Sequence, residues 1–164
     1  MDSIDKFNKL SKTEFISIFG NIFEKTEWIA ERCYESKPYN NFDELVSKMM
    51  KIFENIEKER HLEILNSHPD LAVEKKLTED SKNEQKNANL IQCTDEEFVE
   101  FKKLNEEYKK KFAFPFIIAV KGKNKEEILN SFRQRITNNI NLEFEEAKKQ
   151  VKKIASFRLG EIIK

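Results

Sequence analysis

The sequence predicts an all-α fold, as a single compact multi-helix domain over residues 1–164. Glycine and proline are scarce, with three of each in 164 residues, so few positions interrupt a helix. Apolar residues recur at intervals of three and four along most of the chain, which is the period of an amphipathic helix. Charged residues make up 37% and hydrophobic residues 38%, as expected for helices with densely charged outer faces. The 14 phenylalanines recur at regular spacing, which argues against disorder.

The first half of the chain contains several helix signals. A helix is expected to begin at Ser11, because Glu14 three residues later completes a capping box. A short helix then carries Trp28 and Ile29, and residues 36–41 form a loop. After this loop comes the clearest helical face, in which a methionine pair is typical of core packing. Its members are Phe42, Leu45, Val46, Met49, Met50, Phe53 and Ile56.

The next helix, over residues 59–67, is expected to stop before Pro69. The residue that precedes a proline is disfavoured in the helical conformation, so His68 is expected at a helix end or in a turn. Residues 72–80 are polar and predict a loop, and a further helix is expected to begin near Ser81.

The second half contains one segment that does not follow the helical period. A helix begins after Thr94, with Glu97 as the partner in a second capping box. Residues 114–120 are apolar apart from one proline, and their length and β-branching suit a buried strand. Because no other strand is predicted, we expect a buried extended segment or a short helix. Asn124 is expected to cap the following helix, and the last helix spans about residues 142–160.

Composition limits the kinds of partner and the location. Lys+Arg and Asp+Glu balance at 30 each, whereas nucleic-acid binding needs a basic surface. No run approaches the roughly 20 apolar residues of a membrane helix. The chain starts with charged residues rather than a signal peptide, and it does not end in the peroxisomal Ser-Lys-Leu address. We therefore expect a cytoplasmic protein without nucleic-acid or membrane partners, with Cys33 and Cys93 as reduced thiols.

The last helix carries a charge within its apolar face. Arg158 falls in the middle of a stripe formed by Ala147, Val151, Ile154, Ala155 and Ile162. An unpaired buried charge is costly, so this arginine needs a partner. Two interpretations stay open. One is an internal salt bridge to a glutamate, which periodicity alone favours, and the other is a fork of donors aimed at an anionic ligand.

The two histidines have different surroundings in the sequence. His61 has charged neighbours and is expected to face solvent. His68 either satisfies local carbonyl groups or transfers protons near neutral pH. Ser81 and Glu84 have the spacing of a capping box, and the same geometry would fix a carboxylate at a helix start, with Gln85 beside it.

Other kinds of site are not predicted. The sequence lacks a Glu-x-x-His pair for a di-iron centre, and it lacks a His-Glu-x-x-His motif, a CxxC pair and an EF-hand loop. It also lacks a glycine-rich phosphate loop and a Gly-x-Ser-x-Gly elbow. Metal ions, nucleotides and covalent catalysis are therefore not expected.

Several motifs occur together in one order along nearly the whole chain. They are Phe23-Glu24-x-x-x-Trp28-Ile29-Ala30, His68-Pro69-Asp70-Leu71-Ala72, Ser81-Lys82-Asn83-Glu84-Gln85, Asn105-x-x-Tyr108-x-x-x-Phe112, Phe114-Pro115-Phe116-Ile117-Ile118-Ala119-Val120-Lys121-Gly122 and Lys153-Ile154-Ala155-Ser156-Phe157-Arg158-Leu159. Each motif alone is modest, but their shared order and spacing are specific. The sequence resembles the 2-oxo-4-hydroxy-4-carboxy-5-ureidoimidazoline (OHCU) decarboxylase family.

This resemblance implies a fold, an activity and an assembly. Members of the family are all-helical carboxy-lyases, usually homodimers, with a small-molecule substrate and no metal or organic cofactor. The implied reaction is the decarboxylation of OHCU to (S)-allantoin in urate degradation, a part of purine catabolism.

The resemblance also implies roles for individual residues. His68 would be the catalytic acid/base, Glu84 its acidic partner, and Arg158 the contact to the anionic end of the substrate. The substrate-binding residues would be Pro69, Ser81, Gln85, Phe116, Ile117, Ile118, Ala119 and Val120, the last five through backbone groups.

The sequence departs from the family pattern at two positions. Ala113 stands where the family usually has glycine before Phe-Pro-Phe, and Asn89 stands where an Ala-Gly-Leu ending is usual. Both departures concern the backbone near the expected site, so they bear on rate and fine specificity. Two alternative functions stay open: a non-catalytic helical interaction module that retains the fold, and a decarboxylase that acts on a related ureido acid.

Overall fold

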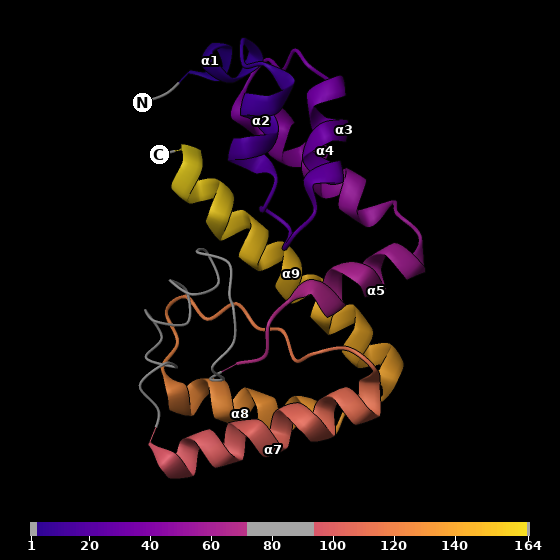
Figure 1. The fold of residues 1–164 in the computed structure, drawn as a ribbon, viewed down its shortest axis with the longest axis vertical. Helices are drawn as coiled ribbons and strands as arrows, with labels where there is room; N and C mark the ends of the chain where they lie inside the picture. Colours follow the sequence, from indigo (N-terminus) through magenta and orange to yellow (C-terminus); the bar gives the residue numbers. More distant parts are fainter. Residues whose placement is uncertain (1–2, 72–93, 164) are drawn as a thin grey trace. The chain divides into compact units, whose positions relative to one another are not determined.

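The computed structural model describes residues 3–71 and 94–163. This part of the chain forms helices and contains no strand, which confirms the all-α prediction (Figure 1). None of its helices combines the length and apolar character that crossing a membrane requires. The chain divides into two compact units. The first is made of two stretches, the chain up to Ser67 and the chain from Lys152 onward. The second is His68–Val151. The expectation of one domain over residues 1–164 stays a prediction.

The first unit contains the helices predicted from Ser11, around Trp28, from Phe42 and over residues 59–67, together with a short initial helix that was not predicted. Their bounds are α1 (Ile4–Asn8), α2 (Lys12–Phe19), α3 (Glu27–Glu35), α4 (Phe42–Glu54) and α5 (Lys58–Ser67). Helix α2 packs against α3, and α3 packs against α4. The end of α9 (Ile140–Ile163) also belongs to this unit.

The predicted capping box of α2 is present. The Ser11 hydroxyl accepts a hydrogen bond from the Glu14 N–H at 3.2 Å, and the Glu14 carboxylate accepts one from the Ser11 N–H at 3.0 Å. Two backbone donors at the helix start, which no preceding turn satisfies, thereby gain partners.

The core of the first unit is built from the apolar faces that the sequence indicated. Leu45, Met49 and Phe53 of α4 are fully buried, as expected for one helical face. The Phe53 ring stacks on Phe23, with the ring centroids 4.7 Å apart and an interplanar angle of 6°. Met49 is therefore a core residue.

His61 does not face solvent, and that prediction was wrong. Its side chain is buried, its Nε2 lies 2.6 Å from the backbone oxygen of Phe53, and its ring meets the Phe53 ring edge-on. The charged neighbours in the sequence lie on other sides of α5. His61 shares a helical face with Ile64 and Leu65, three and four residues later, and both are buried.

The second unit contains α7 (Asp95–Phe112), α8 (Lys125–Arg135) and the first half of α9. Both predicted N-caps are present: Thr94 and Glu97 form a capping box, and Asn124 accepts a hydrogen bond from the Glu127 N–H. Helix α7 packs against α8. The last helix, α9, is longer at both ends than the predicted 142–160.

Residues 114–120 form the predicted buried extended segment, which joins α7 to α8 as irregular backbone (Figure 1). Every residue in this segment is buried. The Phe116 ring stacks on Phe132 of α8 with centroids 3.9 Å apart, and the Tyr108 ring contacts both. Aromatic packing therefore holds the side chains of the segment, but it leaves open how the backbone polar groups are satisfied.

The capping box gives a test of the first unit. Replacing Ser11 by alanine (Ser11→Ala) removes the cap acceptor and is expected to lower the free energy of unfolding by about 1 kcal/mol. The matched control is Ser47→Ala on the exposed side of α4, where alanine favours the helix and the free energy should rise slightly. Urea denaturation measures both. Equal effects of the two substitutions would contradict a capping role for Ser11.

Candidate active site

His68 lies directly after α5, at the start of the second unit. Its side chain is 8% exposed. The helix ends at Ser67, as predicted from the proline at position 69. The sequence therefore places a buried imidazole at a helix end, next to the partly exposed Pro69.

Helix α7 holds the turn that follows His68. The Asn105 side-chain amide donates a hydrogen bond to the backbone oxygen of Leu71 at 3.0 Å, and both residues are buried. One helical turn later, the Lys109 ammonium lies 2.7 Å from the Asp70 carboxylate. The first contact holds the backbone of the turn against α7, and the second adds a side-chain ion pair beside it.

Helix α7 ends in a left-handed residue, which starts the extended segment. Ala113 has φ 64° and ψ 22°, and its N–H donates to the Lys109 oxygen at 2.8 Å. Glycine adopts this conformation at the least cost. The family's usual glycine at this position therefore matches the backbone that Ala113 adopts here with strain.

A buried ion pair fixes the extended segment from the side of α8. Arg135 donates through Nε to Glu143 at 2.7 Å and through Nη1 to the backbone oxygen of Ile117 at 2.6 Å. Its guanidinium also lies over the Phe116 ring, 4.4 Å from the centroid. Glu143 is fully buried, and it accepts a further hydrogen bond from the Tyr108 hydroxyl at 2.6 Å. Each partner of the pair thus makes a hydrogen bond beyond the ion pair itself, Arg135 to Ile117 and Glu143 to Tyr108, which helps offset the cost of burying the charges.

The Tyr108 hydroxyl acts as a donor in this cluster. Burial, first, and the hydrogen bond to Glu143 raise the pKa of Tyr108 above its ordinary value of 10.0. The phenol therefore keeps its proton over the physiological pH range and donates it in the hydrogen bond to Glu143.

Helix α9 fixes the same segment two residues further on, at Ala119. The Gln150 side-chain oxygen accepts a hydrogen bond from the Ala119 N–H at 3.0 Å, and its amide donates to Glu146 at 3.1 Å. The Val120 oxygen accepts from the Lys123 N–H. The Ile117 oxygen, the Ala119 N–H and the Val120 oxygen thus have partners within the protein.

Arg158 belongs to the first unit, where it forms an internal salt bridge. Its Nη2 donates to the fully buried Glu24 carboxylate at 2.9 Å, and its Nη1 donates to the backbone oxygen of Asn21 at 2.8 Å. Of the two interpretations that periodicity left open, the internal salt bridge is present. A contact between Arg158 and the substrate stays a prediction.

The predicted site residues thus fall into three groups. His68, Pro69 and residues 116–120 lie in the second unit, where α7, α8 and α9 anchor their backbone. Arg158 lies in the first unit. Ser81, Glu84 and Gln85, together with the loop over 72–80, Cys93 and the Asn89 departure, lie outside the described residues.

Sequence reasoning missed Arg135, Glu143 and Gln150. Two of them carried the same signal that singled out Arg158. Arg135 continues the apolar face of Ile128 and Phe132 at i+7, and Glu143 precedes Ala147 and Val151 by four and eight residues. A charge in register with a buried stripe indicates a buried pair.

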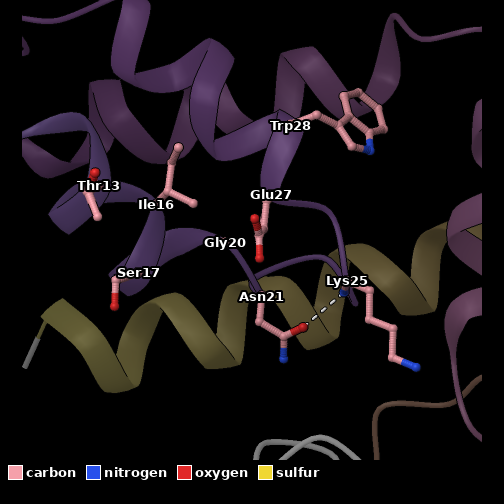
Figure 2. A pocket seen from close by; sticks show the side chains of 8 residues that line it. All are labelled: Thr13, Ile16, Ser17, Gly20, Asn21, Lys25, Glu27 and Trp28. Carbon is pink, nitrogen blue, oxygen red and sulfur yellow. Dashed lines mark hydrogen bonds between the residues drawn. The ribbon is translucent and has the colours of Figure 1, made fainter.

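An open pocket of about 590 Å³ lies on the first unit, and none of its lining residues is a predicted site residue. It is lined by side chains of α2, of the connection to α3 and of the start of α3, with Trp28 at one side (Figure 2). The side-chain oxygen of Asn21 accepts a hydrogen bond from the backbone N–H of Lys25 there, at 2.9 Å. The backbone oxygen of the same Asn21 binds Arg158, so the pocket wall is tied to that salt bridge.

Two further observations bear on the chemistry that the described residues can perform. Among the described residues, no three or more His, Cys, Asp or Glu side chains lie together as a metal site would need. Burial raises the pKa of the Cys33 thiol to about 12, so this thiol stays protonated at neutral pH and is a poor nucleophile.

A family model described as OHCU decarboxylase matches residues 8–160 of this chain. The chain belongs to the OHCU decarboxylase family. Several relatives bear the name of this decarboxylase, which is a carboxy-lyase. The match spans the His68 turn, the extended segment and the Arg158 motif.

The chain is similar to relatives of two lengths. The uric acid degradation bifunctional protein of Bacillus sp. (strain TB-90) is 40% identical over 100% of this chain, which spans only 33% of that protein. The 2-oxo-4-hydroxy-4-carboxy-5-ureidoimidazoline decarboxylase of Haloferax volcanii is 35% identical, over 97% of this chain and 95% of its own length. The chain thus spans about a third of the first relative and nearly all of the second.

Two solved structures have a similar fold. The crystal structure of (S)-allantoin synthase superposes with a TM-score of 0.81 at 27% identity, over 100% of this chain and 54% of that chain. A crystal structure of OHCU decarboxylase in the presence of (S)-allantoin gives a TM-score of 0.70 at 26% identity, over 82% and 89%.

The left-handed Ala113 gives a test of the geometry at the start of the segment. Ala113→Gly removes the strain of a side chain at positive φ and is expected to raise the free energy of unfolding by about 0.5–1 kcal/mol. Ser156→Gly, on the exposed side of α9, is the comparator of opposite sign, because glycine weakens a helix interior. Denaturant unfolding measures both. A loss of stability in Ala113→Gly would argue against the left-handed conformation.

Proposed function

We propose that this chain catalyses the decarboxylation of OHCU to (S)-allantoin in urate degradation. The observation that carries the proposal is the family match over residues 8–160. Relatives of comparable length from Haloferax volcanii and Xenopus laevis, 35% and 30% identical, bear the name of this decarboxylase. The similar structure described with (S)-allantoin supports the assignment of the product.

The structure of the substrate explains why the reaction needs no external electron sink. Its carboxylate is attached to a hydroxyl-bearing carbon, next to a carbon–nitrogen double bond. When carbon dioxide leaves, the electron pair of the broken bond forms a carbon–carbon double bond, and the imine electrons move to nitrogen, which takes a proton. The resulting enol loses its hydroxyl proton while the adjacent carbon gains one, giving the carbonyl group of allantoin. Overall, a proton replaces the carboxylate.

The protein's task in this reaction is to move protons and expose one face of the enol. In the proposed mechanism, His68 moves the proton and Glu84 tunes it, while Arg158 contacts the anionic end of the substrate. Proton transfer by a placed side chain typically contributes about 10²–10⁴-fold, and orientation of the substrate contributes much of the remainder. Residues Pro69, Ser81, Gln85 and the backbone of 116–120 line the site in this proposal.

The proposal extends to assembly, location and cofactors. The chain acts as a homodimer in the cytoplasm, without a metal or organic cofactor, and its partner is a small-molecule substrate rather than nucleic acid or a membrane. The balanced charge of 30 basic and 30 acidic residues supports the exclusion of nucleic acid.

The two histidines provide a matched test. We expect wild-type protein to accelerate the consumption of OHCU generated from urate by urate oxidase and hydroxyisourate hydrolase. His68→Ala is expected to lower kcat by about 10²–10⁴-fold, because the proton-transfer group is lost. His61→Gln is the control: it replaces the other buried histidine, so it should lower the melting temperature while turnover is retained. Near-wild-type turnover in folded His68→Ala would contradict the assigned role.

The same assay separates the alternative functions. A folded wild-type protein that gives no acceleration would favour a non-catalytic helical interaction module. A protein that leaves OHCU unchanged but decarboxylates another ureido or imidazoline acid would favour a related decarboxylase. A panel of such acids, followed by release of carbon dioxide, distinguishes these outcomes.

A further inference from the structure

Asn105 is a buried amide within a face of α7 that is otherwise aliphatic and aromatic. The buried residues of this helix are Phe101, Leu104, Asn105, Tyr108 and Phe112, and Asn105 is 3% exposed. Asparagine is a poor helix former, because its side chain competes for backbone hydrogen bonds. Burying an amide is also costly unless it is hydrogen-bonded. An apolar side chain would suit this position of the helix better, so the amide has to be explained by what it binds.

The amide of Asn105 binds the backbone of the turn after His68. Its Nδ2 donates to the Leu71 oxygen at 3.0 Å, and Leu71 is 5% exposed. A buried carbonyl group nearly always has a hydrogen-bond partner in native proteins. A side chain without an N–H at position 105 would take this donor away and leave the cost of a buried carbonyl group unmet. Asn105 therefore holds one defined backbone atom of the turn.

This contact reaches His68 because the chain between them is short and stiff. Only Pro69 and Asp70 separate His68 from Leu71, and the proline ring fixes the backbone angle φ of residue 69 at about −65°. A displacement of the Leu71 backbone is therefore passed on to His68 rather than absorbed within the turn. The His68 side chain is itself buried, at 8% exposed, so its ring has a defined position to lose.

A second contact from α7 reaches the same turn, but it constrains the backbone less. The Lys109 ammonium lies 2.7 Å from the Asp70 carboxylate, with the lysine side chain 43% exposed and the aspartate side chain 13% exposed. Solvent screens such a pair, and two side chains lose freedom when it forms. It also holds a side chain, whereas Asn105 holds the main chain. The hydrogen bond from Asn105 is therefore the stronger constraint on the backbone of the turn.

We propose that Asn105 is a positioning residue for the decarboxylation: by holding the Leu71 carbonyl group, it keeps the His68 ring where the ring transfers the proton. The proposal rests on the proposed function, since it concerns the residue that moves the proton there. Asn105 acts through the turn and not on the substrate. Loss of its contact therefore slows the chemical step and leaves substrate binding nearly unchanged.

Asn105→Leu tests this split between rate and binding. Leucine has a similar volume and favours the helix, but it has no N–H for the Leu71 oxygen. We expect kcat to fall about ten- to hundredfold, because a displacement of about 1 Å can cost on the order of 10²-fold. KM should stay within about twofold of wild type. The coupled OHCU assay described above measures both, and a kcat near that of wild type in folded Asn105→Leu would overturn the proposal.

The position of the His68 ring is measured without the reaction. The chain has two histidines, so isotope-labelled histidine gives two sets of ring signals in an NMR spectrum. The spectrum of His61→Gln identifies the set that belongs to His68. We expect the His68 ring signals to move in Asn105→Leu, since the ring changes its surroundings. Ring signals that stay where they are in wild type would contradict the proposal.

Two variants of α7 are the matched controls. Leu104→Ala removes apolar atoms from the neighbouring buried position, which is 9% exposed, and keeps the Asn105 donor. It should lower the melting temperature, while kcat stays within about twofold of wild type and the His68 signals keep their place. Lys109→Met removes only the ion pair with Asp70, so it should lower kcat at most about fivefold.

The controls also define the results that would overturn the proposal. If Leu104→Ala lowers kcat and moves the His68 signals as much as Asn105→Leu does, the effect is general loosening of α7. If Lys109→Met has the larger effect, the ion pair positions the turn. Should Asn105→Leu fail to fold, Asn105→Ala decides in its place, since it also removes the donor and needs less room.

Failure of the proposed function is recognised separately. Wild-type protein would then not accelerate the consumption of OHCU, and a role of Asn105 in that reaction would fall with it. The His68 ring signals would still show whether Asn105 holds the ring. An active wild type whose kcat and ring signals are insensitive to Asn105→Leu would contradict only the role of Asn105.

Discussion

The second unit depends on the contacts of one buried carboxylate, that of Glu143. It is fully buried, so its charge has to be paired inside the protein. Arg135 from α8 supplies the counter-charge, and Tyr108 from α7 supplies a neutral donor. Because Arg135 also binds the Ile117 oxygen, one carboxylate on α9 ties together α7, α8 and the extended segment. The backbone of that segment is irregular, and side chains of α8 and α9 hold it at Ile117 and Ala119.

Helix α7 gives the candidate site a common support. Asn105 and Lys109 hold the turn after His68, while Tyr108, between them in sequence, packs on the rings of the extended segment. The turn after His68 and the extended segment therefore both rest on α7. Catalytic groups need such rigid support to stay within a fraction of an ångström of the productive geometry.

Local signals in the sequence were enough for most of the helices but for only part of the site. The caps at Ser11 and Thr94 and the break at Pro69 depend on neighbours within four residues, so spacing alone located them. The surroundings of His61 and the partners of Arg135 depend on other helices, which periodicity does not identify. For Arg158, periodicity predicted burial, but the partner Glu24 lies 134 residues away in the sequence. The family resemblance rested on the order of the motifs, and the match of the family model to residues 8–160 confirmed it.

The handedness of the product tests most directly whether a fixed site controls this reaction. Spontaneous decay of OHCU is expected to give racemic allantoin, because water delivers a proton to either face of the enol. Circular dichroism of the product, recorded with excess wild-type protein added to OHCU formed in situ, distinguishes the two cases. We expect a signal of (S)-allantoin alone, since a substrate fixed in the proposed site exposes one face of the enol. A racemic product formed at an accelerated rate would contradict a substrate fixed by residues 116–120, and no acceleration would contradict the decarboxylase function itself.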